Sequence, residues 1–181
     1  GYKMAKLYGV GVGPGDPELI TVKAVNIIKK CSVIAFPDMN TAYKIAKAAC
    51  PEIEAKELAA LKFLMTGNKE EESKAHQAAA FSLEKYLDED KDIAFLTLGD
   101  PCIYSTFMYI EKIVAAHGYE TEIISGVPSF CAAGAAFKIS LAEGNTQLHI
   151  VTGGGNIAEA AKYKGNKVIM KAGKSLKAVK Q

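Results

Sequence analysis

The sequence predicts an α/β protein whose first part forms a mostly parallel β-sheet. Short apolar runs alternate with amphipathic segments along most of its 181 residues, a pattern typical of βαβ units. Three of the apolar runs lead into loops of small residues, "GVGPGDP", "LGDPCIYS" and "SGVPSF". Because parallel sheets bind ligands at the carboxyl ends of their strands, these loops predict a site at that edge.

Residues 6–124 are expected to alternate five strands with four helices. The predicted strands are residues 6–12, 32–36, 61–65, 92–98 and 119–124. The predicted helices are residues 18–30, 41–49, 68–89 and 105–117. In the first helix, Asp16 is the expected N-cap and Pro17 the first helical residue. The inward side chains of that helix are expected to be Leu19, Val22, Val25 and Ile28.

A second α/β unit is predicted after about residue 140. The segments "LHIVTG" and "KVIMKAG" are expected strands, with "IAEAAKY" as a helix between them and "KSLKAVKQ" as the beginning of another helix. We therefore predict an N-terminal α/β domain over residues 1–118. Residues 119–181 are predicted to form an incomplete C-terminal α/β domain.

The composition argues against several kinds of partner. A net charge of +2 does not imply a polyanion-binding surface, so no nucleic-acid partner is expected. Residues 123–137, the longest uncharged stretch, are too few to span a bilayer, so no membrane partner is expected. The four cysteines form no CxxC pair, which argues against a metal site and favours a reducing, cytoplasmic location. All 22 basic residues are lysine, so bidentate arginine contacts to anions are excluded.

The first glycine-rich loop does not fit the known nucleotide motifs. In the three registers of Gly-x-Gly-x-x-Gly, the third glycine is replaced by Pro14, Asp16 or Glu18. The later "GKS" is no P-loop either, because Val168 stands where that motif needs a glycine. Two interpretations remain open: a tight strand-to-helix turn, or part of a concave backbone wall for a ligand that is not a polyphosphate.

Three segments together resemble the tetrapyrrole (corrin/porphyrin) methylases. They are "LYGVGVGPGDPELITVKAVNIIKKCSVIAFP", "DIAFLTLGDPCIYSTFMYI" and "GYETEIISGVPSFCAAGAA", in this order and spacing. The segments "FLTLGDPCIYSTF" and "GVPSFCAA" are most similar to the branch that methylates C20 of precorrin-2 or cobalt-factor II in cobalamin biosynthesis.

The resemblance implies a homodimeric enzyme of two α/β domains, with S-adenosylmethionine bound in the cleft between them. It implies that Pro14 lies at the base of the cleft, and that Gly99, Asp100 and Ile103 form the main cofactor wall. The remaining cofactor contacts that it implies are Ser105, Thr106, Pro128, Ser129 and Met170. The substrate would be a tetrapyrrole, whose C20 carbon attacks the methyl group in line, so that alignment and exclusion of water supply most of the catalysis.

Two residues of the second loop keep alternative interpretations. Asp100 is either the base that takes the C20 proton or a turn and cap residue. Tyr104 either lines the macrocycle or packs near a helix start. Methylation at another corrin carbon, a diphthine-synthase-like activity and a non-catalytic binding module are the alternative functions. An NAD(P) oxidoreductase is disfavoured by the broken fingerprint.

Overall fold

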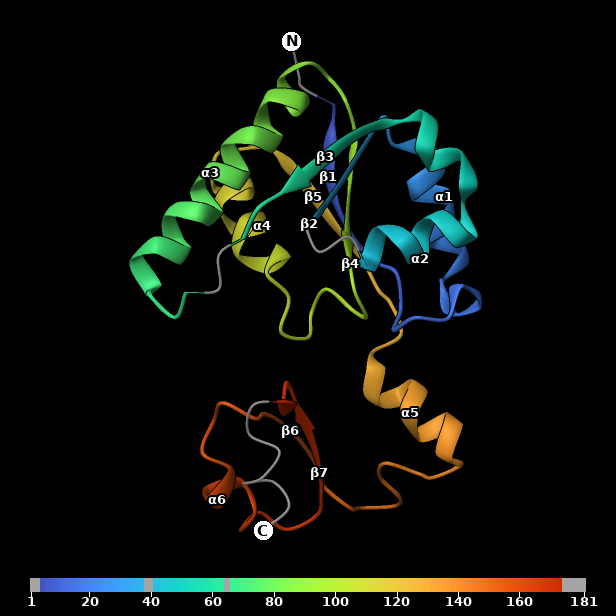
Figure 1. Ribbon diagram of the computed structural model, residues 1–181, viewed down its shortest axis with the longest axis vertical. Helices are drawn as coiled ribbons and strands as arrows, with labels where there is room; N and C mark the ends of the chain where they lie inside the picture. Colours follow the sequence, from blue (N-terminus) through green and yellow to red (C-terminus); the bar gives the residue numbers. More distant parts are fainter. Residues whose placement is uncertain (1–3, 38–40, 64–65, 174–181) are drawn as a thin grey trace. The chain divides into compact units, whose positions relative to one another are not determined.

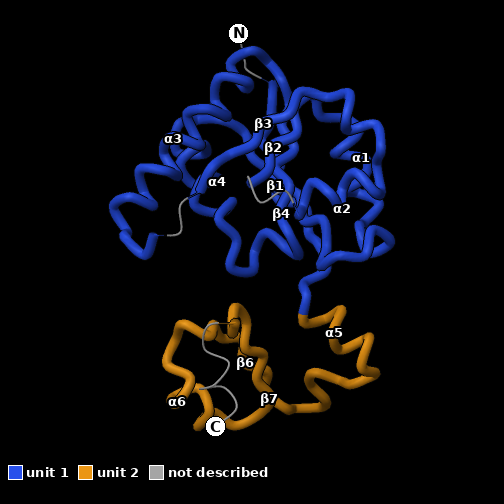
Figure 2. Tube along the Cα trace, viewed as in Figure 1, with its two compact units in different colours: residues 1–129 blue, residues 130–181 orange. Residues whose placement is uncertain are grey.

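The computed structural model describes residues 4–37, 41–63 and 66–173. The chain divides into two compact units, Gly1–Ser129 and Phe130–Gln181, which Figure 2 colours separately. Among the described residues, no helix is both long and apolar enough to cross a membrane.

The first unit is built on a five-stranded sheet in which every pairing is parallel (Figure 1). The strands are β1 (Lys6–Gly11), β2 (Val33–Pro37), β3 (Glu57–Leu61), β4 (Ile93–Thr97) and β5 (Glu120–Ile124), in the order β3-β2-β4-β1-β5. The register places Gly11 beside Thr97 and Val10 beside Ile124. The predicted parallel sheet is therefore confirmed, and β1, β4 and β5 end side by side.

Helices cover both faces of this sheet. On one face lie α1 (Val22–Lys30) and α2 (Thr41–Ala49), and on the other lie α3 (Lys69–Asp88) and α4 (Phe107–Ala116) (Figure 1). Alternate residues of β1 serve the two cores: Tyr8 packs with Ile28 and Ile45, while Leu7 packs with Leu83 and Ile110. Burial on both faces is the reason the central strands read as continuous apolar runs.

The first predicted helix is wrong in one respect, because two short elements replace it. A 3-10 turn (Pro17–Leu19) begins at Asp16, which caps it as predicted by accepting the Glu18 N–H at 2.9 Å. The α-helix α1 then begins separately at Val22, and its N-cap Thr21 accepts the Ala24 N–H through its hydroxyl at 3.1 Å. The extended break changes the helical phase, so Val22, predicted to face inward, is 77% exposed.

The third strand lies earlier than predicted. It was expected over residues 61–65 but is β3, Glu57–Leu61, preceded by a 3-10 turn (Pro51–Ala55). β3 is an edge strand, and two of its five side chains are buried. Its apolar pattern is therefore weaker than that of the central strands. Residues 64 and 65 lie outside the described part of the chain.

The second unit contains a parallel pair of strands, β6 (Leu148–Thr152) and β7 (Asn166–Met170). It also holds α5 (Ser129–Phe137) from its second residue on, and α6 (Ile157–Ala160). The helix expected at 174–181 lies outside the described residues. The division after Ser129 differs from the expected boundary after residue 118, because β5 pairs with β1 and completes the first sheet.

Candidate functional site

Three glycines bring the loops after β1, β4 and β5 into direct backbone contact. A Cβ added to Gly126 would lie 2.1 Å from the carbonyl oxygen of Gly99 and 2.9 Å from Cα of Gly11. A Cβ on Gly11 would lie 2.7 Å from the same Gly99 oxygen. Atoms do not approach this closely, so a side chain at either position would force the loops apart. We call Gly11, Gly99 and Gly126 the glycine junction.

Backbone hydrogen bonds extend the sheet into this junction. The Val12 N–H donates to the Thr97 carbonyl at 2.9 Å, and Gly13 and Gly99 exchange two bonds at 3.2 and 2.8 Å. Gly13 and Gly99 hold φ angles of 78° and 69°, which glycine adopts readily and other residues do not. The glycines of both Gly-Asp-Pro loops are therefore needed for a turn that binds the two loops to each other.

The Asp100 carboxylate holds the second and third loops together. Its Oδ1 accepts the Cys102 N–H at 2.8 Å, and its Oδ2 accepts the Gly126 N–H at 2.9 Å. Asp16, in the first Gly-Asp-Pro loop, accepts the Glu18 N–H of its own turn at 2.9 Å. The two aspartates thus differ: one caps a turn locally, and the other joins two loops across the sheet edge.

The predicted site residues of the first unit gather on these three loops. Pro14 follows Gly13 and is half-buried, and Pro128 lies with its Cα 3.8 Å from the position of a Cβ on Gly99. Ser129, which is exposed, begins α5. The loop that leads into α4 carries the remaining predicted residues of this unit, which are Ile103, Ser105 and Thr106. The Ser105 hydroxyl accepts the Phe107 N–H at 3.2 Å.

Met170, the predicted contact from the second unit, is the last residue of β7. Its register partner is Thr152, at the end of β6. Met170 therefore also stands at the carboxyl end of a parallel strand, in the two-stranded sheet of the second unit.

Sequence reasoning missed Gly11 and Gly126 as site residues. Gly11 ends β1 and Gly126 lies just after β5, and these two strands pair with each other. The signal that could have found them is a glycine at the carboxyl end of each of two neighbouring strands. That signal depends on knowing the strand order, which places β1 between β4 and β5. Strand order is not visible in the local pattern of residues.

The Cys102 thiol lies beside the Asp100 carboxylate. Desolvation, the nearby Asp100 charge and a hydrogen bond to Asp100 raise the pKa of the Cys102 thiol, so it stays protonated near neutral pH. Within the described ranges, no group of three His, Cys, Asp or Glu side chains could hold a metal ion. Leu98, directly before Gly99, is 50% exposed. The site thus offers backbone polar groups, one carboxylate and apolar surface.

A parallel sheet whose three strand-end loops meet through glycines defines an α/β protein with a candidate ligand site at the carboxyl edge of its sheet. Residues 6–181 match the model of the Tetrapyrrole (Corrin/Porphyrin) Methylases. The chain belongs to this family, which confirms the resemblance carried by the three loop segments.

The relatives agree with this assignment. The chain is 40% identical over 154 residues to the "Probable cobalt-precorrin-2 C(20)-methyltransferase" of Methanocaldococcus jannaschii, covering 82% of the chain and 64% of that relative. It is 28% identical to the cobalt-precorrin-2 C(20)-methyltransferase of Salmonella typhimurium, over 92% of the chain and 72% of the relative. The chain thus spans less than two thirds of the Methanocaldococcus protein.

The fold also matches a solved structure. The crystal structure of a cobalt precorrin-4 methyltransferase is similar with a TM-score of 0.76 and 26% identity, over 96% of this chain and 72% of the other. The expected tetrapyrrole-methylase fold is therefore confirmed.

Proposed function

We propose that this protein is an S-adenosylmethionine-dependent C-methyltransferase that methylates C20 of precorrin-2 or cobalt-factor II in cobalamin biosynthesis. The observation that carries the proposal is the glycine junction with its Asp100 bridge, found in a chain of the tetrapyrrole methylase family. The 40% identity to a relative named for this reaction favours C20 over other ring positions.

The residues of the junction suit the proposed cofactor. S-adenosylmethionine carries a sulfonium beside an amino-acid carboxylate, so its site needs hydrogen bonds from the backbone and little net charge. A Cβ on Gly99 would come no closer than 3.8 Å to the Cα of Pro128, so Gly99 leaves space beside its loop. Pro14, Ile103 and Pro128 lie on the same three loops. When bound, the cofactor supplies the methyl group, and the chain holds it in line with the attacking carbon.

Asp100 has two roles in this proposal. Its bonds to Cys102 and Gly126 position the cofactor loops, each through one carboxylate oxygen. A carboxylate has about four acceptor sites in all, so accepting two N–H groups leaves lone pairs for a proton. Asp100 is therefore our proposed base for the proton that leaves C20.

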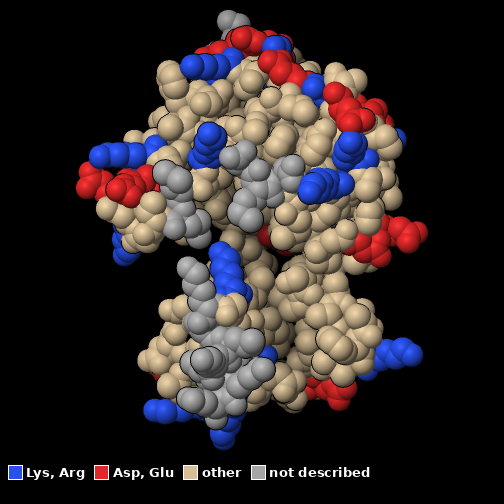
Figure 3. Space-filling model, viewed as in Figure 1, with Lys and Arg blue, Asp and Glu red and all other residues tan. Residues whose placement is uncertain are grey.

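The substrate's carboxylates would be held by lysine, because the chain has no arginine. Many lysines of the first unit are already in ion pairs, such as Lys23 with Glu122 at 2.9 Å and Lys91 with Glu57 at 2.9 Å. On the face shown in Figure 3, lysine and acidic side chains are interspersed around the first unit. A homodimer acting in the cytoplasm completes the proposal, on the strength of the family resemblance.

The test is methyl transfer by the purified full-length protein. It is incubated with S-adenosylmethionine and either precorrin-2 or cobalt-factor II, and the product is examined for a mass gain of one methyl group and for its position by NMR. We expect methylation at C20 of one macrocycle. A methyl group at another ring carbon would favour the second candidate, an activity like that of the precorrin-4 methyltransferase whose structure is similar. No transfer to either substrate would refute the proposal.

A further inference from the structure

Tyr104 adopts a backbone conformation that is unfavourable for an aromatic residue. Its φ angle is 47°, in the left-handed region, where a Cβ crowds the backbone and where Gly, Asn or Asp are the usual residues. Among the described residues, three other non-glycine residues share this region: Asp90, Lys138 and Lys171. Asp90 and Lys138 lie just past the ends of α3 and α5, where a left-handed residue closes a helix. Tyr104 lies before α4, so closing a helix does not account for it.

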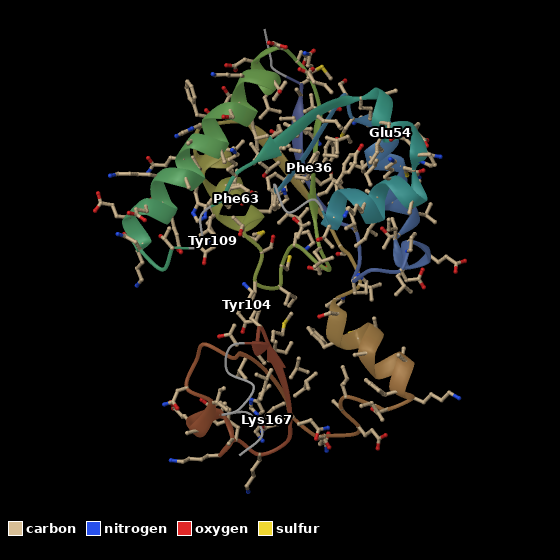
Figure 4. All side chains as sticks on the ribbon, in the orientation of Figure 1. Phe36, Glu54, Phe63, Tyr104, Tyr109 and Lys167 are labelled. Carbon is tan, nitrogen blue, oxygen red and sulfur yellow. The ribbon has the colours of Figure 1, made fainter. Side chains whose placement is uncertain are left out.

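Tyr104 lies outside both hydrophobic cores of the first unit. The residue is 46% exposed, whereas Phe107, three residues later, is fully buried. Figure 4 shows Tyr104 on the loop between β4 and α4, beyond the carboxyl end of the sheet. Burial of the ring in the core of the first unit is therefore not what holds this backbone conformation.

Two apolar residues and the proposed cofactor residues share the loop of Tyr104. The same loop carries the half-exposed Leu98 and the half-buried Ile103, and it is held to the third loop by Asp100. Gly99 and Asp100, where we place the cofactor, come four to five residues earlier in the loop and are more buried than Tyr104. Aromatic rings bind planar π-systems by offset stacking, and the tyrosine hydroxyl can meet a polar rim.

We propose that Tyr104 stacks on the tetrapyrrole macrocycle and helps to select a flat, ring-shaped substrate. This inference rests on the proposed function, because it takes the macrocycle as the substrate. The left-handed backbone turns the ring away from the core, and the Asp100 bridge holds the loop in that position. Tyr104 is a binding residue in this account and takes no part in proton transfer.

The test uses Tyr104→Gly and Tyr104→Phe in the full-length protein, with Phe81→Ala as the control. Glycine removes the ring and accepts the left-handed backbone, so the thermal midpoint should stay within about 3 °C of the parent. Phenylalanine keeps the ring. Phe81 is also an exposed aromatic, 63% exposed, but it lies on α3 with Lys85 over its ring. For each variant, macrocycle affinity is measured by absorbance titration and S-adenosylmethionine affinity by calorimetry.

We expect Tyr104→Gly to weaken macrocycle binding and raise its KM by about tenfold, with S-adenosylmethionine affinity unchanged. Tyr104→Phe and Phe81→Ala should stay within about twofold of the parent in both affinities. Unchanged macrocycle affinity in Tyr104→Gly would overturn the inference, and so would an equal loss of both affinities or a large fall in thermal midpoint. If the parent binds a macrocycle without methylating it, the proposed function fails while this binding comparison stands. If the parent binds neither macrocycle, both are refuted.

Discussion

The Oδ2 of Asp100 accepts the backbone N–H of Gly126 at 2.9 Å, joining two loops that are 26 residues apart in the chain. The other oxygen accepts the Cys102 N–H, so the carboxylate fixes its own loop and the next one together. Asp16 and Asp100 look equivalent in the two Gly-Asp-Pro motifs, but the Asp100 carboxylate joins two loops, whereas the Asp16 carboxylate caps its own turn. The contacts between these loops and the packing of the core beneath them lead to four predictions.

Asp100→Ala should lower kcat for methyl transfer by at least about 100-fold, because the proposed base is removed. It should also lower the free energy of unfolding by about 2 kcal/mol, because two N–H groups lose a charged acceptor. The measurements are single-turnover methyl transfer, S-adenosylmethionine affinity and urea unfolding.

Asp16→Ala is the matched control, since the Asp16 carboxylate caps its own turn by accepting the Glu18 N–H. We expect it to cost about 1 kcal/mol of stability and to leave kcat unchanged. If Asp100→Ala weakens cofactor affinity in proportion to its loss of activity, Asp100 only positions the loops. Equal effects of the two substitutions would contradict a special role for Asp100.

Gly126→Ala should disrupt the glycine junction, because its Cβ would meet the Gly99 carbonyl oxygen at 2.1 Å and neither partner is a flexible side chain. We expect a loss of about 2–3 kcal/mol in the free energy of unfolding, together with weaker S-adenosylmethionine binding. Gly154→Ala is the control, since a Cβ there would point into open space and the φ angle of Gly154 is not left-handed. A Gly126→Ala protein with the parent's stability and affinity would show that the loops do not meet as described.

Gly9→Ala should overpack the core beneath the site, because its Cβ would lie 2.1 Å from Cε1 of Phe107. The expected cost is about 1–3 kcal/mol in free energy of unfolding. Phe107→Leu should relieve the clash, so the double variant should lose less stability than the sum of the two single losses. Urea unfolding of the four proteins measures this coupling, and strictly additive losses would contradict the contact.

The Cys102 thiol should react slowly with iodoacetamide near neutral pH. Desolvation first, and then the charge of Asp100 and a hydrogen bond to it, raise its pKa, so the thiolate forms only at higher pH than for an ordinary cysteine. Asp100→Asn removes the charge and should move the alkylation profile of Cys102 to lower pH. The measurement is the rate of modification against pH, by mass spectrometry of the labelled peptide.

Cys131 is the internal control for that experiment, because it is the other exposed thiol, whereas Cys31 and Cys50 are buried. Its profile should be the same in the parent and in Asp100→Asn. An unshifted Cys102 profile in Asp100→Asn would show that the Asp100 charge does not act on this thiol.

The sequence alone determined the alternation of strands and helices, the parallel sheet and the three loops that carry the site. These depend on local signals: apolar runs, helical spacing, and glycine or proline after a strand. Asp16 as a cap was predictable for the same reason, since a cap acts within its own turn. The family resemblance depends on the same three segments.

Only the tertiary structure decided the strand order, the glycine junction and the role of Asp100. The Asp100–Gly126 bond and the Gly11–Gly99–Gly126 contacts join residues whose proximity depends on β1 pairing between β4 and β5. The phase of α1 was misjudged because an extended break at Ile20 and Thr21 reset it, so Val22 faces solvent. Residue periodicity does not reveal which strands pair, because pairing depends on which segments meet in space. It also does not reveal a short extended break between two helical elements.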